Sequence, residues 1–414
     1  MRTIATPVPV KERIVLLDVL RGLAIFGILM VNMQLFFSPM LTVAIRTMEQ
    51  TPLLERLSII FIKFFFEGKF YVLFSFLFGY GAYLFLQKEI KEGSSILPVY
   101  RRRMFILLLI GILHIVVFWP GDILSSYALL GLLLLAFRKA SDKRLLQWAS
   151  WLVILPSLLT ALLTLFIALM MNIPEAATPL LENLEGSGKL LQGMVDKAIA
   201  VYSSGTFAEM ARMRITEYLT ILQGIVFFYP VVLAMFLMGM LAARKGLIQN
   251  FRHYIPFFHR TAILGAAVGI PLSILFVVSF FIMNPQRPDL YQVLNMLSTA
   301  LGGVFLGLFY VSVIVLMLNR GKLQTFSRLL APVGRMALTN YLMHSIICTS
   351  IFYGYGFGLY GKVSIFQGIL LTILIFALQI PFSQFWLNHF HYGPFEWLWR
   401  SLTYGKLQPF RKKT

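Results

Sequence analysis

The stretch RRRMFILLLIGILHIVVFWPGDILSSYALLGLLLLAFRK, residues 101–139, decides the fold. It holds two apolar runs, 104–119 and 122–138, each long enough to cross a bilayer as a helix. Only Pro120 and Gly121 separate these runs, and Lys or Arg residues flank the hairpin at both ends. Because Lys and Arg beside membrane spans favour the cytoplasmic side, the pattern predicts a helical hairpin whose turn lies outside.

The same alternation of apolar runs and basic clusters continues along the whole chain. With the N-terminus inside, 25 of the 36 Lys and Arg fall in cytoplasmic segments, Lys88 and Lys91 among them, and 11 of the 17 acids fall outside. The sequence therefore predicts an all-α polytopic integral membrane protein with about ten transmembrane helices and both termini in the cytoplasm. The predicted spans are 14–37, 70–87, 104–119, 122–138, 145–171, 219–243, 261–283, 296–318, 336–353 and 363–387.

Composition agrees with a membrane location. Hydrophobic residues make up 58% of the chain and charged residues 13%, and the net charge is +19. In a soluble protein this charge would suggest nucleic acid, but here the basic residues flank apolar runs, where anionic lipid headgroups explain them. We therefore expect the lipid bilayer as a partner and no nucleic acid. The single cysteine, Cys348, excludes an intramolecular disulfide.

The chain is predicted to form one membrane domain, 1–414, with two additional segments. The first is an extracytoplasmic loop, 172–218, in which apolar residues between Leu190 and Tyr202 follow a helical period. Thr206 and Glu209 form a possible capping box for a second helix in this loop. These amphipathic helices are either a lid over an outer cavity or paddles on the surface. The second segment is a basic cytoplasmic tail, 388–414.

The first predicted span carries polar residues that are costly within hydrocarbon. Asp18 and Arg21 are three residues apart and can pair on one helix face. Arg21 and Asn32 are separated by about three helical turns and share a face. This arrangement indicates either an elongated binding site or pathway, or a snorkelling arginine and an asparagine that joins two helices.

The hairpin of residues 101–139 brings a histidine and a carboxylate to similar depth. His114 lies near the outer end of one span, and Asp122 begins the next. A carboxylate that orients an imidazole is the arrangement of general-base catalysis. The alternative is a buried structural histidine with a hydrogen-bonded partner.

Further polar residues extend the set of candidate binding residues. Glu67 and Lys69 stand at the outer mouth of the second span, where they bind a polar acceptor or mark the headgroup boundary. Asn340, Tyr341 and His344 lie within one turn of the ninth span and bind substrate or pack between helices.

The cytoplasmic ends of the spans offer sites for an anion. Arg21, Arg102 and Arg335 are the candidates to hold the phosphates of a cofactor, with Asp18 paired to Arg21. No zinc spacing, nucleotide motif or nucleophile elbow occurs in the sequence, and we expect no metal and no permanently bound cofactor.

Several of these motifs together resemble the YeiB family of bacterial polytopic membrane proteins, known as domain of unknown function 418. The resemblance covers nearly the entire chain and implies a multi-pass protein of the bacterial cell membrane. It rests on the stretches LLDVLRGLAIFGILMVNM, EGKFYVLFSFLFGYG, RRRMFILLLIGILHIVVFWPGDILSSYALLG, GRMALTNYLMHS, FYGYGFGLYG and GPFEWLWRSLTYG.

The first span is also similar to that of the transmembrane acyltransferases, which include enzymes that O-acetylate bacterial surface glycans. In that group an Arg is followed, after ten intervening residues, by a His. Arg21 matches the Arg, but Asn32 stands where the His would be, and an asparagine cannot accept a proton. If the chain is an acyltransferase, His114 with Asp122 must serve as the base.

These observations favour two functions. The first is transfer of an acyl group from cytoplasmic acyl-CoA, as co-substrate, to an extracytoplasmic or lipid-borne hydroxyl or amine. His114 would be the base, and Asn32 and Tyr341 would donate hydrogen bonds to the oxyanion. The alternative is a secondary transporter of a small polar or anionic molecule, in which the intramembrane ionisable residues form a relay. The oligomeric state is left open.

Overall fold

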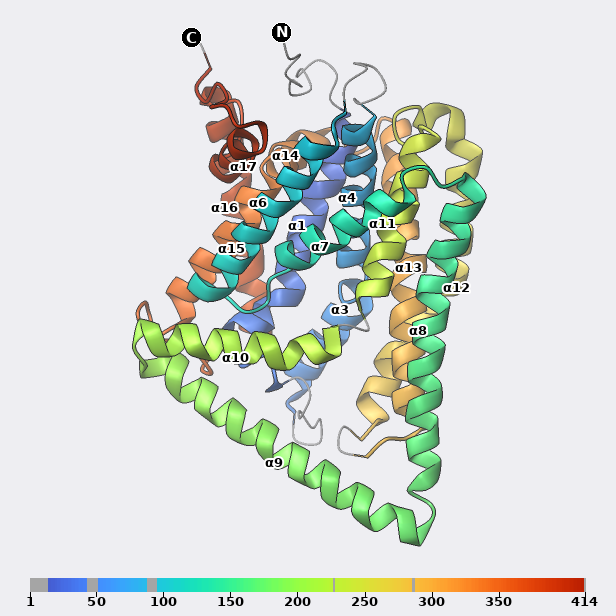
Figure 1. Ribbon diagram of the computed structural model, residues 1–414, viewed down its shortest axis with the longest axis vertical. Helices are drawn as coiled ribbons and strands as arrows, with labels where there is room; N and C mark the ends of the chain where they lie inside the picture. The colour runs from blue at the N-terminus through green and yellow to red at the C-terminus, as the bar shows by residue number, and fades with distance from the viewer. Residues whose placement is uncertain (1–13, 43–50, 88–94, 226–227, 285–286, 413–414) are drawn as a thin grey trace.

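The computed structural model describes residues 14–42, 51–87, 95–225, 228–284 and 287–412, and helices account for nearly all of them (Figure 1). Lys88 and Lys91 lie outside these ranges. The helices are α1 (Val15–Phe37), α3 (Leu53–Phe65), α4 (Phe70–Leu86), α6 (Leu97–Val117), α7 (Leu124–Leu133), η2 (Leu134–Phe137), α8 (Asp142–Met170), α9 (Pro174–Ser204), α10 (Phe207–Ile225), α11 (Tyr229–Arg244), η3 (Phe251–Tyr254), α12 (Ile255–Ile282), α13 (Leu290–Asn319), α14 (Gln324–Arg335), α15 (Ala337–Phe352), α16 (Ile365–His389) and α17 (Pro394–Tyr404).

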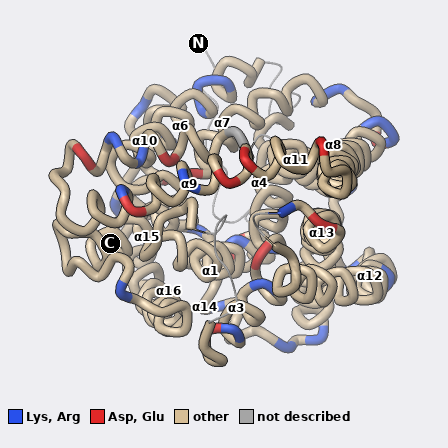
Figure 2. Tube along the Cα trace, turned by 90° about the horizontal axis from the view of Figure 1, so that it is seen from below, with Lys and Arg blue, Asp and Glu red and all other residues tan. Residues whose placement is uncertain are grey.

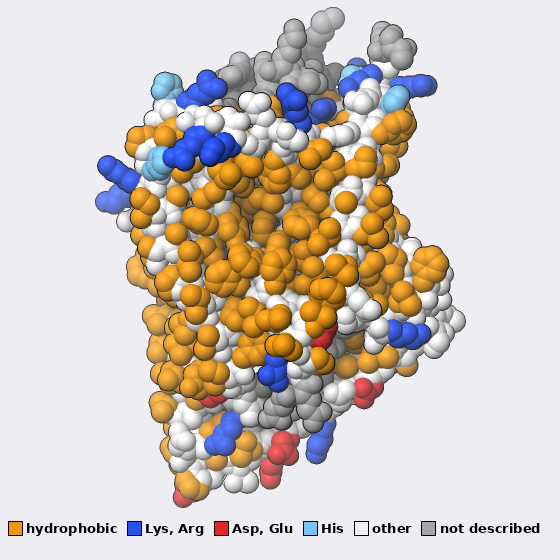
Figure 3. Space-filling model, turned by 180° about the vertical axis from the view of Figure 1, so that it is seen from behind, with side chains coloured by type: hydrophobic (Ala, Val, Ile, Leu, Met, Phe, Trp, Pro, Cys, Tyr) orange, Lys and Arg blue, Asp and Glu red, His pale blue; other side chains and the backbone are white. Residues whose placement is uncertain are grey.

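The helices form a membrane bundle, which confirms the predicted all-α polytopic fold. Five of them are long and apolar enough to cross a bilayer: α1, α8, α12 with η3 before it, α13 and α16. Two shorter apolar helical segments are also present, one formed by α7 with η2 and the other by α11. Hydrophobic side chains cover a broad band of the surface, with Lys and Arg gathered at its upper end (Figure 3). The count of ten spans and the cytoplasmic termini stay predictions.

Helix α1 lies in the middle of the bundle, where it packs against α4, α14, α15 and α16 (Figure 2). Its approach to α14 is close because two glycines face the opposite backbone. A Cβ on Gly22 would lie 2.4 Å from the Leu330 carbonyl oxygen, and a Cβ on Gly334 would lie 1.8 Å from that of Asp18. This contact between the two backbones brings Arg335, the next residue along, to the end of the bundle where Arg21 lies.

The predicted sixth span, 219–243, is wrong at its beginning. Residues up to Ile225 belong to α10, and a separate helix, α11, begins at Tyr229. Helix α10 lies across the lower end of the bundle in Figure 1, away from the ends of α6 and α17 that lie at the top. The apolar run of the sequence is therefore divided between two helices, α10 and α11, that run in different directions.

The loop of residues 172–218 forms two helices, as predicted, and the capping box is present. The Thr206 backbone N–H donates to Glu209 Oε2 at 2.7 Å, and the Glu209 N–H donates to Thr206 Oγ1 at 3.3 Å. Only the C-terminal third of α9 packs closely, through the buried side chains of Val195, Ala198 and Tyr202. Most of α9 is thus exposed, whereas α10 rests on the bundle.

Candidate active site

A cavity of about 320 Å³ opens among α1, α4, α6, α15 and α17. Its lining changes along its length. Near α17 it is lined by four arginines, and farther in by apolar side chains such as Ile28, Leu107 and Leu124. Ile123 and Tyr341 also line it. Ligand sites in proteins commonly combine such an apolar body with a few convergent polar groups.

The arginines at the mouth come from four different elements. They are Arg21 of α1, Arg103 of α6, Arg335 at the end of α14 and Arg400 of α17. Arg21 Nη1 donates to Asp18 Oδ1 at 2.8 Å, which confirms the predicted pair. The Arg103 guanidinium lies 3.8 Å from the centre of the Trp399 ring, a cation–π contact that holds the charged group at the cavity.

Among the described residues that line the cavity, Glu396 of α17 is the one acidic side chain, and its carboxylate accepts several hydrogen bonds. Its Oε1 accepts the backbone N–H groups of Leu338 at 2.7 Å and Thr339 at 3.0 Å, and its Oε2 accepts the Thr339 hydroxyl at 2.5 Å. Burial raises the pKa of Glu396, and these donors oppose the shift. Because this carboxyl is engaged at the beginning of α15, the mouth presents an excess of guanidinium groups suited to phosphate.

His114 and Asp122 form the predicted pair, and a third residue completes the arrangement. His114 Nδ1 lies 3.0 Å from Asp122 Oδ1, and His114 Nε2 lies 2.7 Å from Ser345 Oγ. Asp122 Oδ2 also accepts the Ser125 N–H at 2.7 Å, which fixes the carboxylate at the beginning of α7. All three side chains are buried. A serine, a histidine and an aspartate in this order have the hydrogen-bond pattern of a nucleophile, its base and the residue that orients the base.

Tyr341 separates the cavity from this triad. Its ring centre lies 5.4 Å from that of His114. Its hydroxyl accepts the Ile123 N–H and donates to the Gly121 carbonyl, both at 3.3 Å. Tyr341 is thus held against the turn between α6 and α7, one helical turn from Ser345.

Asn340 and His344, which were grouped with Tyr341, face another helix. Asn340 Nδ2 donates to the Val333 carbonyl and to Ser383 Oγ, each at 3.1 Å. His344 Nε2 lies 2.8 Å from Gln379 Oε1 of α16. The two faces of α15 therefore divide the predicted set, with Tyr341 and Ser345 on the side of His114.

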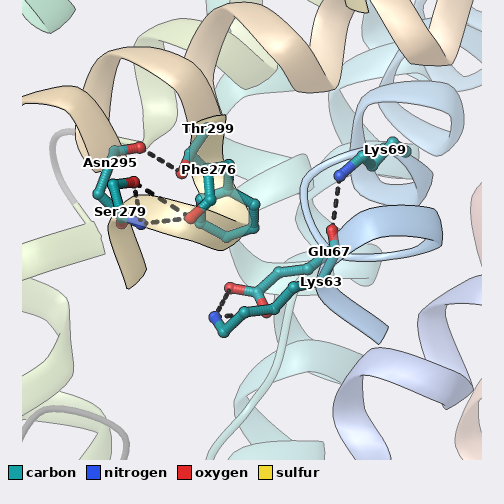
Figure 4. Close-up of polar contacts among 7 residues, drawn as sticks. All are labelled: Lys63, Glu67, Lys69, Phe276, Ser279, Asn295 and Thr299. Carbon is teal, nitrogen blue, oxygen red and sulfur yellow. Dashed lines mark hydrogen bonds and ion pairs between the residues drawn. The ribbon is translucent and has the colours of Figure 1, made fainter. Parts of the chain in front are cut away.

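Glu67 and Lys69 lie in a second polar cluster, between α3, α4, α12 and α13 (Figure 4). Lys63 Nζ lies 3.0 Å from Glu67 Oε2 and 3.7 Å from the centre of the Phe280 ring. Lys69 Nζ donates to the Lys63 carbonyl at 2.7 Å and is buried. The ammonium group of Lys69 satisfies a carbonyl where α3 ends, and neither Glu67 nor Lys69 lines the large cavity.

Two other predicted residues lie away from the cavity. Asn32 is partly buried on α1 and does not line it. Arg102 is exposed, and its neighbour Arg103 lines the cavity instead. Among the described residues, no group of three or more His, Cys, Asp and Glu is placed to hold a metal ion.

Sequence reasoning missed the contribution of the tail. Helix α17 supplies Glu396, Trp399 and Arg400 to the cavity. The amphipathic spacing of PFEWLWRSLTY was a usable signal, since apolar and polar residues alternate there at helical intervals. Ser345 was visible as the residue one turn after Tyr341, but its contact with His114 depends on how two distant helices meet.

The similarity to known proteins extends over nearly the whole chain. Residues 242–406 match the family described as a protein of unknown function, DUF418. The uncharacterized protein YxaH of Bacillus subtilis (strain 168) is 36% identical over 99% of this chain and 98% of its own length. The uncharacterized protein YeiB of Escherichia coli (strain K12) is 30% identical over 97% of this chain and 99% of its own length. No solved structure matches the chain.

Proposed function

Since the chain belongs to the DUF418 family of membrane proteins, together with YeiB and YxaH, and the family's description names no activity, we propose a function from the geometry of its site. This function is transfer of an acyl group from cytoplasmic acyl-CoA to an extracytoplasmic or lipid-borne hydroxyl or amine. The observation that carries the proposal is a cavity lined by four guanidinium groups and by Tyr341, whose ring packs against that of His114. The protein would work in the bacterial cell membrane.

The polar and apolar parts of the cavity match the polar and apolar parts of an acyl-CoA. The phosphates of the nucleotide would bind at the mouth, where Arg21, Arg103 and Arg335 offer charged donors. The pantetheine arm and the acyl group would extend along the apolar part. The thioester carbonyl would then lie near Tyr341, whose hydroxyl would donate a hydrogen bond to the developing oxyanion in place of the Gly121 carbonyl.

His114 would supply the base. Asp122 binds its Nδ1, so that Nε2 is the nitrogen available to accept a proton. Tyr341 lies between the cavity and His114, so its side chain would have to move before a thioester could reach the base. The two hydrogen bonds that would then break are long, at 3.3 Å each.

The test is release of free CoA thiol from acetyl-CoA by the full chain in lipid nanodiscs, with a pooled membrane and cell-wall extract as acceptor. His114→Ala should lower the acceptor-dependent rate at least about 100-fold, the loss typical of removing a general base. His259→Ala, a substitution at an exposed histidine on α12, is the matched control and should leave the rate unchanged. Near-UV and far-UV spectra would show that both variants fold.

A second candidate function, secondary transport, is favoured by the cluster at the junction of α3 and α4. Lys63, Glu67 and Lys69 occupy a break between two helices, and breaks of this kind line substrate sites in transporters. If the nanodisc protein releases no CoA and calorimetry shows no acyl-CoA binding, uptake of small anions into proteoliposomes becomes the assay. Uptake that is lost in Lys69→Gln would favour transport.

A further inference from the structure

A second, smaller cavity lies on the other side of the triad. It has a volume of about 170 Å³ and is lined by Val117 and Phe118 at the end of α6, Ile346 and Thr349 of α15, and Phe207 at the beginning of α10. Val117 and Phe118 follow His114 by one turn, and Ile346 and Thr349 follow Ser345. The large cavity contacts the same two helices on the opposite side of these residues, at Leu107 and Tyr341. Along α6 and α15, His114 and Ser345 therefore lie between the residues that line the large cavity and the residues that line the second cavity.

Helix α10 holds this second cavity in place. Arg214 Nη1 donates to the carbonyls of Val116 and Val117 at 2.8 Å, which are terminal carbonyls of α6 that lack partners within the helix. Glu217, one turn later, accepts the Tyr202 hydroxyl at 2.6 Å and the Met40 N–H at 3.2 Å. Helix α10, which contributes Phe207 to the cavity, is thus anchored through Arg214 and Glu217.

We propose that Ser345 is a catalytic nucleophile that carries the acyl group as an ester between the two cavities. This inference rests on the proposed acyl transfer. A thioester that enters from the arginine side and an acceptor that enters beneath α10 need not meet, because Ser345 Oγ lies between them. Its distance of 2.7 Å from His114 Nε2 lets the imidazole remove its proton, which an isolated hydroxyl would retain at neutral pH.

The acyl group would be transferred in two steps, acylation of Ser345 and then transfer to the acceptor. In the first, Ser345 Oγ attacks the thioester carbonyl, its proton passes to His114 Nε2, the carbon–sulfur bond breaks, and the leaving thiolate takes that proton. In the second, the acceptor hydroxyl attacks the Ser345 ester carbonyl and gives its proton to His114 Nε2. The bond from the carbonyl to Ser345 Oγ breaks, and the serine recovers the proton. Asp122 keeps the imidazole oriented in both steps.

The experiment is to incubate the full chain in nanodiscs with radiolabelled acetyl-CoA in the absence of acceptor, and to locate the label by peptide mass spectrometry. The label should lie on Ser345, and it should leave when acceptor extract is added. Ser345→Ala should lose the label and lower the rate of CoA release at least about 100-fold. Ser298→Ala is the matched control, because Ser298 is a buried span serine that bonds only to carbonyls of its own helix.

A second variant, Ser345→Cys, tests the same proposal if Ser345→Ala disturbs folding. Ser345→Cys should accept the label as a thioester, which neutral hydroxylamine removes, whereas the oxygen ester of the natural protein resists it. The chain has one other cysteine, Cys348, which is buried. A purely structural serine would show no such change in the chemistry of the label.

The outcomes separate the two proposals. Acceptor-dependent CoA release with no label on Ser345, or a label on another residue, would overturn the acyl-serine while acyl transfer stands. Release that persists in Ser345→Ala would do the same. If the natural protein neither releases CoA nor binds acyl-CoA, both proposals fall.

Discussion

Arg102 and Arg103 are adjacent in the sequence but occupy different surroundings. Arg103 lines the cavity and packs on Trp399, whereas Arg102 is exposed to solvent. Loss of one charged hydrogen-bonding group to phosphate costs about 1.5–3 kcal/mol, so Arg103→Gln should weaken acetyl-CoA binding about 10-fold or more. Arg102→Gln should change it by less than about 2-fold. Isothermal titration in nanodiscs measures both, and equal losses would place the phosphates elsewhere.

The pair of arginines also shows what a residue pattern can and cannot predict. Asp18 with Arg21, and His114 with Asp122, were predictable because a helical period or a short turn joins their positions. Which member of the Arg101–Arg103 run faces the cavity depends on the packing of α17 against α6, and these elements are distant in sequence. The contact of Ser345 with His114 depends on tertiary packing in the same way.

At the scale of elements, the capping box at the beginning of α10 gives a prediction for stability. Thr206 donates its backbone N–H and its hydroxyl to Glu209, and these hydrogen bonds lower the pKa of Glu209. A lowered folded pKa means that the stabilisation is present above the unfolded pKa and is lost as pH falls through the folded value. Amide exchange at residues 207–211, corrected for intrinsic rates, should therefore accelerate below about pH 4.

A substitution tests the same cap at neutral pH. Thr206→Ala removes the hydroxyl, and the usual cost of losing such a cap, about 1 kcal/mol, corresponds to exchange about fivefold faster at 207–211. Thr220→Ala is the control, because the Thr220 hydroxyl bonds the Thr216 carbonyl within the helix. Unchanged exchange in Thr206→Ala would show that α10 is held by Arg214 and Glu217 alone.

Element boundaries were predictable where charge and apolar content change together. Helices α1, α4 and α16 begin and end within a few residues of the predicted spans. The beginning of the sixth span was not predictable from the sequence. Residues 219–228 are apolar enough to belong to a span, but α10 lies across the end of the bundle. Amino-acid composition indicates which segments are apolar, but it carries little information on the direction in which a helix runs.

At the scale of the whole molecule, the distribution of charge predicts orientation. The end that carries α17 should face the cytoplasm, and α9 should face outward. In a Cys348→Ser background, a membrane-impermeant maleimide should label Lys197→Cys in intact cells, and Lys406→Cys only after permeabilisation. Both native side chains are exposed, so access does not depend on folding state. Labelling of Lys406→Cys in intact cells would reverse the assigned orientation.

The burial of His114, Asp122 and Ser345 has a consequence for the proton permeability of the membrane. A bundle with polar groups at its centre risks becoming a leak for protons, since a continuous file of water would dissipate the proton-motive force. The three side chains are buried, and the ring of Tyr341 packs against His114, an arrangement that leaves little solvent-exposed surface on these polar groups. Under the proposed mechanism, an acyl group would cross as a neutral ester while the membrane remains an electrical insulator.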